Sequence, residues 1–127
     1  MNIKELHNKA MELAALADIQ KMQNNKDSAM SLYEESYCLE YEAAMNAYNT
    51  KAGEPTVSVL LRSAASLAIS CRRLREAEIL ITLAFTGEPP WEIAEELKKM
   101  FENINFYRRL EMKSPVSYTK KTVEEFA

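Results

Sequence analysis

The sequence predicts an all-α fold of about five helices. Only two glycines and four prolines occur among 127 residues, a composition that favours long helices over turn-rich β structure. Apolar residues recur at the 3.6-residue period of an amphipathic helix along most of the chain. In addition, one spacing of large and small residues occurs twice, which indicates an internal repeat.

The first two helices are expected at residues 3–24 and 28–48. The first has an apolar stripe that no glycine or proline interrupts, as in an amphipathic helix. Residues 24–26 form a turn, and Asp27 or Ser28 is expected to cap the second helix by accepting a hydrogen bond from a free backbone N–H group.

Three further helices are expected at residues 56–72, 75–85 and 91–109. Gly53 suits the end of the preceding helix and Pro55 suits the first turn of the next, in line with the usual positions of these residues at helix ends. The small side chains that crowd the first of these three helices indicate close packing against a neighbour.

The chain length fits one domain. We expect this domain to span residues 1–112, with hairpins at about 3–48 and 56–86 followed by the helix at 91–109. Residues 113–127 are polar and lack sustained helical periodicity, so we expect a mobile tail there.

The charge and hydropathy of the chain argue against several classes of protein. The formal net charge is −3, so the basic excess of a nucleic-acid-binding protein is absent and we expect no nucleic-acid partner. No signal-peptide pattern follows Lys4 and Glu5. The longest charge-free apolar stretches, such as residues 79–87, are far too short to span a membrane. We therefore expect a cytoplasmic protein without a membrane partner.

The repeated spacing indicates two helical hairpins. Six residues of the first unit recur 48 positions later in the second. They are Leu13, Leu16, Ala17, Ala29, Tyr33 and Ser36, repeated as Leu61, Ala64, Ala65, Ala77, Ile81 and Ala84. Small side chains let two helices approach closely, while larger ones beside them fill the remaining space. We interpret each unit as two antiparallel helices that pack through these positions.

This pattern resembles the tetratricopeptide repeat (TPR), which spaces large and small residues over two antiparallel helices. The second unit has Pro89 where the family has a proline, whereas the first unit has Tyr41 there. Without this proline the second helix can continue, which accounts for a period longer than the family's roughly 34 residues. The family's tryptophan and glycine are absent from both units. The resemblance implies right-handed superhelical stacking of the hairpins, with residues 91–109 as a C-terminal capping helix.

The resemblance also implies a binding groove, because the first helix of each TPR lines a concave surface that binds peptides. The residues expected to line it here are Asp18, Lys21, Arg62, Ser66, Ser70 and Arg73. The last four recur at steps of four, four and three, which places them on one helix face. Arginine can hold a carboxylate through two parallel hydrogen bonds, so an acidic or C-terminal peptide is a reasonable ligand. The alternative is an exposed face without a ligand.

A second candidate surface consists of tyrosines on the second helix. Tyr37, Tyr41 and Tyr48 follow Tyr33 along one helix face, and Tyr33 itself is expected in the core. Tyrosine is enriched at protein interfaces, so these three residues are candidates for self-association as a homodimer. Burial against the fifth helix is the alternative.

A third hypothesis is a nucleic-acid-linked regulatory helical bundle. It would use four arginines near the third helix. They are Arg62, Arg72, Arg73 and Arg75. This cluster is small for a duplex-binding surface, since several phosphate contacts are needed for appreciable affinity.

No catalytic pattern is found. His7 is the only histidine, so a two-histidine metal centre is excluded, and we expect His7 to be solvated. Adjacent glutamates such as Glu34 and Glu35 point about 100° apart on a helix and do not converge. Cys38 and Cys71 lack metal-ligand spacing and are expected to be buried. We therefore expect a non-catalytic protein–protein interaction module, without cofactor or metal, that binds a protein or peptide.

Overall fold

The computed structural model describes residues 1–112 and shows five α-helices and no strand within them. The helices are α1 (Ile3–Met22), α2 (Lys26–Asn49), α3 (Thr56–Ser70), α4 (Leu74–Phe85) and α5 (Trp91–Glu111). The expected all-α fold is therefore confirmed. The tail expected at residues 113–127 lies outside the described residues.

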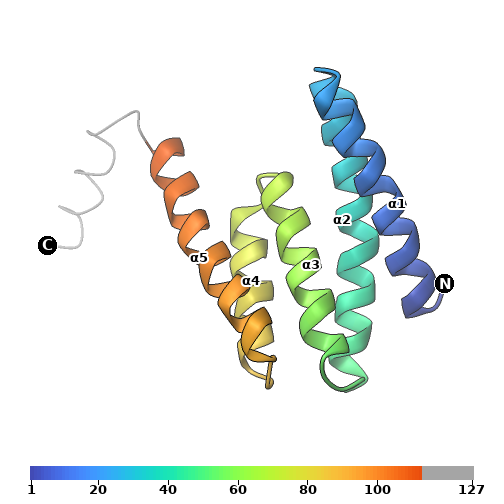
Figure 1. Ribbon diagram of the computed structural model, residues 1–127, viewed down its shortest axis with the longest axis vertical. Coiled ribbons are helices and arrows are strands. Elements are labelled where there is room, and N and C mark those ends of the chain that lie inside the picture. Colours follow the sequence, from blue (N-terminus) through green and yellow to red (C-terminus); the bar gives the residue numbers. More distant parts are fainter. Residues whose placement is uncertain (113–127) are drawn as a thin grey trace, which may run out of the picture.

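The helices form two layers (Figure 1). In this view α1, α3 and α5 form the nearer layer, while α2 and α4 lie behind them. Helix α2 packs on both α1 and α3, and α5 packs on α3 and α4. One core cluster of buried side chains draws on all five helices. The nearer layer is the face that carries the candidate site.

The turn after α1 lies slightly earlier than expected, because residues 23–25 separate the end of α1 at Met22 from the start of α2. Helix α2 begins at Lys26, with Asn25 at its N-cap and no side-chain hydrogen bond to the first turn, so the expected cap at Asp27 or Ser28 is wrong. Asn24 adopts the left-handed conformation, with φ of 63°. Asparagine tolerates this conformation better than most residues, and a single such residue reverses the chain direction within three residues.

The two hairpin turns have nearly the same backbone conformation, 48 residues apart. Asn24 and Arg72 have φ values of 63° and 61°. The following residues, Asn25 and Arg73, have φ, ψ of −91°, 70° and −90°, 68°. Each donates its N–H to the carbonyl five residues earlier, at 2.9 Å from Gln20 and 2.8 Å from Ala68. The repeat found in the sequence is therefore also a repeat of backbone geometry.

Most of the repeated positions are buried in both hairpins. The exception is the pair formed by Leu16 and its counterpart Ala64. Leu16 is 50% exposed, whereas Ala64 is fully buried. Helix α3 packs on α2, α4 and α5, whereas α1 packs closely on α2 alone. The exposure of Leu16 therefore reflects the position of α1 at one end of the array.

The extension of α2 beyond the repeat is buried by neighbouring helices. Ala43, Ala44 and Ala47 are all fully buried, and α2 packs on α1 and α3. After it, Gly53 supplies a left-handed φ of 94°, a conformation that glycine adopts at little cost. Glu54 then accepts hydrogen bonds from the Ser58 N–H at 3.0 Å and the Ser58 hydroxyl at 2.7–2.8 Å, which caps α3.

Helix α5 covers the second hairpin, and its outer face carries both charged and apolar side chains. Ile93, Leu97 and Ile104 are buried against α3 and α4, as expected of a capping helix. A terminal cap normally has a polar outer face. The exposed face of α5 includes charged residues such as Glu95, Lys98 and Glu102, and it also exposes Trp91 by 74% and Phe106 by 55%.

His7 is only partly solvated, whereas it was expected to be solvated. Its Nδ1 lies 2.8 Å and 3.0 Å from the two carboxylate oxygens of Glu40. Glu40 is fully buried on α2, and the His7 side chain is 32% exposed. Burying a carboxylate without a partner is costly, so this contact is needed to satisfy Glu40 and it joins α1 to the extension of α2.

We expect His7→Ala to lower the free energy of unfolding by about 2 kcal/mol, because it leaves a buried carboxylate without its partner. Urea denaturation measures the change. The matched control is Lys9→Ala, which removes an exposed side chain from the same helix and is expected to change stability by less than about 0.5 kcal/mol. Equal losses in the two variants would show that the contact between His7 and Glu40 does not stabilise the fold.

Candidate binding groove

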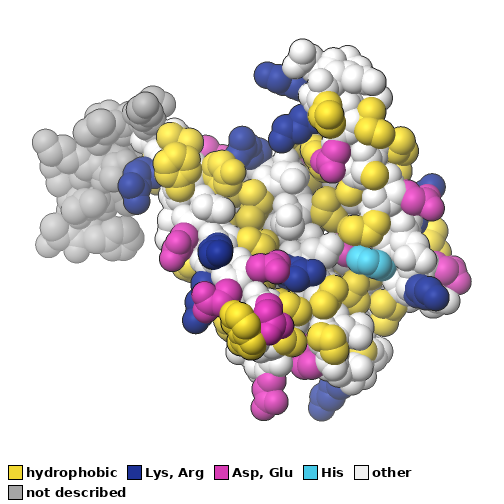
Figure 2. Space-filling view, viewed as in Figure 1, with side chains coloured by type: hydrophobic (Ala, Val, Ile, Leu, Met, Phe, Trp, Pro, Cys, Tyr) yellow, Lys and Arg dark blue, Asp and Glu magenta, His cyan; other side chains and the backbone are white. Residues whose placement is uncertain are grey.

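A hollow of about 690 Å³ lies between the three helices of the nearer layer. Helices α1 and α3 both pack on α2, and the hollow occupies the space in front of it. Its lining residues are Met11, Ala14 and Asp18 of α1, Tyr33 of α2, Arg62, Ser63, Ser66, Leu67 and Ser70 of α3, and Glu96, Lys99 and Met100 of α5. The space-filling view shows this face as concave (Figure 2).

Helical periodicity places these residues on the hollow. Met11, Ala14 and Asp18 follow one another at steps of three and four, which aligns them along one face of α1. Ser66 and Ser70 are likewise one turn apart on α3, and both are exposed. The structure therefore brings together four of the expected groove residues: Asp18, Arg62, Ser66 and Ser70.

Tyr33 contributes to the floor although it belongs to α2. Its side chain is only 8% exposed, and its hydroxyl donates a hydrogen bond to the Asp18 carboxylate. Burial, followed by this bond to a carboxylate, raises the pKa of Tyr33 to about 12, because both favour the neutral phenol. The contact fixes the Asp18 carboxylate against the wall of the hollow.

Arg62 and Glu96 join the α3 and α5 walls. The Arg62 guanidinium lies 3.2 Å from the Glu96 carboxylate. Together with Asp18 and Lys99, they give this part of the surface two acidic and two basic side chains. A ligand here would meet mixed charges beside the apolar side chains of the lining.

A second hollow, of about 390 Å³, continues the first toward the C-terminal end of α1. Tyr33 and Ser70 line both hollows, so the two hollows are adjacent, and we refer to them together as the groove. Its other lining residues are Lys21, Lys26, Ala29, Met30, Ile69, Arg72 and Tyr107. Figure 2 shows basic side chains along the upper rim of this face. Lys21, expected in the groove, therefore lies in this second part.

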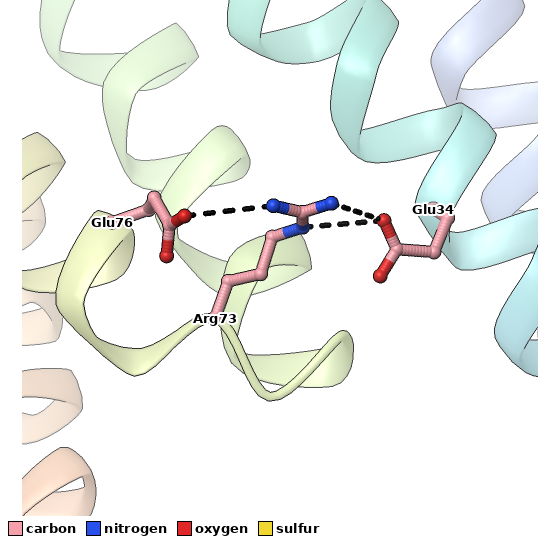
Figure 3. Close-up of polar contacts among 3 residues, drawn as sticks. All are labelled: Glu34, Arg73 and Glu76. Carbon is pink, nitrogen blue, oxygen red and sulfur yellow. Dashed lines mark hydrogen bonds and ion pairs between the residues drawn. The ribbon is translucent and has the colours of Figure 1, made fainter.

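Arg73 does not line the groove. Helix α3 ends at Ser70, and the left-handed Arg72 turns the chain before Arg73, so the regular spacing of the α3 face does not extend to it. Its Nε and Nη2 donate to Glu34 Oε2 at 3.2 Å and 2.8 Å, and its Nη1 lies 3.5 Å from Glu76 (Figure 3). The hydrogen bonds to Glu34 are the main cause that raises the pKa of Arg73 above its ordinary value.

The three candidate tyrosines for self-association do not share an exposed surface. Tyr37 is 6% exposed, with the Arg73 guanidinium 5.3 Å from the centre of its ring. Tyr41 is 43% exposed, and its ring centre lies 5.8 Å from that of Tyr37. Tyr48 is half-buried, and its hydroxyl lies 3.4 Å from that of Thr86 at the end of α4. Tyr37 and Tyr48 thus contact the second hairpin, and α2 has no close packing with α5.

Within residues 1–112, no group of three or more histidine, cysteine, aspartate or glutamate side chains is arranged to hold a metal ion. No described helix combines the length and apolar character needed to cross a membrane. Cys38 is exposed rather than buried as expected, whereas Cys71 is buried. Burial is the main cause that raises the pKa of the Cys71 thiol to about 12.

Sequence reasoning missed the contribution of α5 to the groove. Glu96, Lys99 and Met100 line it, but residues 91–109 were expected to act only as a cap. The order of the helices could have indicated this contribution. Helix α5 follows α4 as α3 follows α2, so α5 can be expected in the same layer as α1 and α3. Tyr33 was expected only in the core, although a tyrosine can bury its ring and still direct its hydroxyl into a groove.

No protein-family model, curated protein or solved structure matches this chain. What the groove binds must therefore be argued from its own residues.

We expect Arg73→Ala to lower the free energy of unfolding by about 1 kcal/mol, because it removes a partly exposed ion pair and a cation–π contact between the two hairpins. The control is Arg75→Ala, an exposed arginine at the start of α4, with an expected change below about 0.5 kcal/mol. Urea denaturation measures both. If Arg73→Ala is as stable as Arg75→Ala, the contacts in Figure 3 do not hold the hairpins together.

We expect the stability of the fold to decrease as pH rises from about 10 to about 12. Burial raises the pKa of both Tyr33 and Tyr37 from 10.0 to about 12. Above pH 10 the unfolded chain therefore loses these protons first, which favours unfolding. Below pH 10 both tyrosines are neutral in either state, and this contribution is constant.

The variant Tyr33→Phe/Tyr37→Phe should show a smaller loss of stability over this alkaline range, whatever its stability at neutral pH. Urea midpoints are measured at intervals between pH 8 and pH 11.5, a range that spans the ordinary tyrosine pKa of about 10. They give the slope of stability against pH for the parent and for the double variant. Tyr41→Phe, which changes an exposed tyrosine, is the control. Identical slopes for the double variant and the parent would show that Tyr33 and Tyr37 do not cause the alkaline loss of stability.

Proposed function

We propose that this protein is a non-catalytic protein–protein interaction module that binds a peptide segment of a partner in the groove along α1, α3 and α5. The observation that carries the proposal is the adjacency of the two hollows, which share Tyr33 and Ser70. Two adjacent hollows suit an elongated ligand such as a peptide. The resemblance of the sequence to the tetratricopeptide repeat supports the same function.

The lining of the groove suits a peptide chain. Met11, Leu67 and Met100 provide flexible or apolar contacts, and methionine adapts well to different side chains. Ser66 is exposed on α3 beside them, so its hydroxyl can hydrogen-bond a peptide backbone. A peptide presents both apolar side chains and polar backbone groups along its length, so it can contact both kinds of lining residue.

The charged groups of the groove are arranged for recognition. Asp18 accepts a hydrogen bond from Tyr33, and Arg62 pairs with Glu96. Groups held in this way keep a fixed position, so a ligand of matching charge pattern does not have to order them. The proposed activity is therefore binding without chemical conversion of the ligand.

A groove-filling substitution tests the proposal. We expect Ser66→Phe to weaken ligand binding at least about tenfold, because an added ring occupies the hollow that the ligand must enter. Ser66 is exposed, so the fold is expected to tolerate the change. The matched control is Ser31→Phe, which places the same ring at an exposed position of α2 that lines none of the described hollows.

Ligands for this test can be selected from a random peptide library displayed on phage, with the full chain as the target. Fluorescence anisotropy of the selected peptides then gives dissociation constants for the parent and both variants. Binding that Ser66→Phe and Ser31→Phe weaken equally, or failure to select any peptide, would contradict a peptide-binding groove.

A further inference from the structure

Three basic side chains from different segments line the smaller hollow of the groove. Lys21 belongs to the last turn of α1, Lys26 begins α2, and Arg72 lies in the turn between α3 and α4. Among the residues described, no carboxylate lines this hollow. The ion pairs found within residues 1–112 involve none of these three cations. This end of the groove therefore presents a concentration of positive charge.

Arg72 is held in place before any ligand binds. Its backbone is fixed in the left-handed turn, with φ of 61°, and its guanidinium lies 4.8 Å from the centre of the Tyr107 ring. None of the ion pairs found within residues 1–112 involves this guanidinium, so its N–H groups can hold a carboxylate. Because Arg72 is already oriented, its ordering costs less free energy on binding.

The position of Lys26 is unfavourable for helix stability. It is the first residue of α2, where the positive end of the helix dipole disfavours a cation. The neighbouring Asp27 is acidic, but it is not part of the lining of the hollow. A residue that departs from local preference is a candidate for function, and a basic side chain here adds to the charge of Lys21 and Arg72.

The rest of the hollow is largely apolar. Ala29, Met30, Ile69 and Tyr107 line it between the basic side chains, and Met30 is 39% exposed. A ligand that complements this lining has carboxylates for the cations and an apolar or aromatic side chain for the surface between them.

We infer that the smaller hollow binds an acidic segment of a partner protein, in which carboxylates flank an aromatic or large aliphatic residue. This inference rests on the proposed peptide-binding function and assigns the chemistry of one end of the groove. It also gives the ligand a direction, because the larger hollow carries Asp18 and Glu96 as well as basic residues.

A protein segment fits this groove better than a nucleic acid does. A nucleic-acid strand carries a phosphate at every nucleotide and requires basic residues along its whole path. Here the path continues past Asp18 and Glu96, which repel phosphates, and the chain as a whole has a net charge of −3. An acidic peptide can place its carboxylates at one end only.

Two synthetic peptides test the inference on the full chain. The first is a fluorescein-labelled Glu-Glu-Phe-Glu-Glu-Leu peptide, and the second replaces each glutamate with glutamine. We expect the acidic peptide to bind at least about tenfold more tightly than the neutral one at low salt, and the difference to shrink as salt screens the charges. Fluorescence anisotropy gives both dissociation constants.

The variant Lys21→Gln/Lys26→Gln/Arg72→Gln removes the three basic side chains, all of which are exposed. We expect it to bind the acidic peptide at least about tenfold more weakly. The matched control, Lys4→Gln/Arg75→Gln/Lys98→Gln, removes the same charge from exposed positions outside this hollow and should bind like the parent. Circular dichroism melting curves verify that both variants are folded, and Lys21→Glu alone gives a second measure of the same effect.

The outcomes distinguish this inference from the proposed function. If library-selected peptides are sensitive to Ser66→Phe but not to the basic-residue variant, the groove binds peptides and the inference is wrong. If neither the selected nor the acidic peptide binds, both are wrong. If oligo(dT) competes for the same basic residues more strongly than the acidic peptide, the site is a nucleic-acid site and the inference is overturned.

Discussion

The close approach of α2 to α1 and α3 is the constraint on which the remaining structure depends. Each of these helices has small side chains that are fully buried, among them Ala17 on α1, Ala44 on α2 and Ala65 on α3, and small side chains allow helices to approach closely. Larger side chains at such positions would force the helices apart. Because α1 and α3 are held against α2 rather than packed closely on each other, the space in front of α2 remains open as the groove.

Ion pairs then determine which charged residues are free to bind a ligand. Arg62 is joined to Glu96, Arg73 to Glu34, and Arg108 to Glu78. Each pair links segments that are distant in the sequence. A count of basic residues in the sequence therefore does not show that these three arginines are already paired. The basic residues of the smaller hollow lie outside these pairs, so the packing of the helices concentrates free positive charge at one end of the groove.

The helices could be predicted from the sequence because their signals are local. Amphipathic periodicity and helix-ending residues placed all five elements. The second hairpin turn was misplaced, because residues 56–72 were expected to be helical whereas α3 ends at Ser70 and Arg72 adopts the left-handed conformation. The contact between His7 and Glu40 could not be predicted, since it joins residues far apart in the sequence. The site was predicted only in part: four expected residues line the larger hollow and Lys21 the smaller one, but Arg73 lies elsewhere because helix α3 ends three residues before it.

The first hairpin is longer than the second because α2 extends beyond the repeat, and the buried residues of this extension indicate its structural role. The extension of α2 carries Glu40 and three alanines that are fully buried, so its main role is to hold α1 and α3 in position. Tyr37, which begins this region, is covered by Arg73. The deviation from the repeat therefore stabilises the scaffold, and the features that we propose distinguish one ligand from another lie along the groove. Since the two ends of that groove differ in charge, they are expected to select both the composition of a bound segment and its direction.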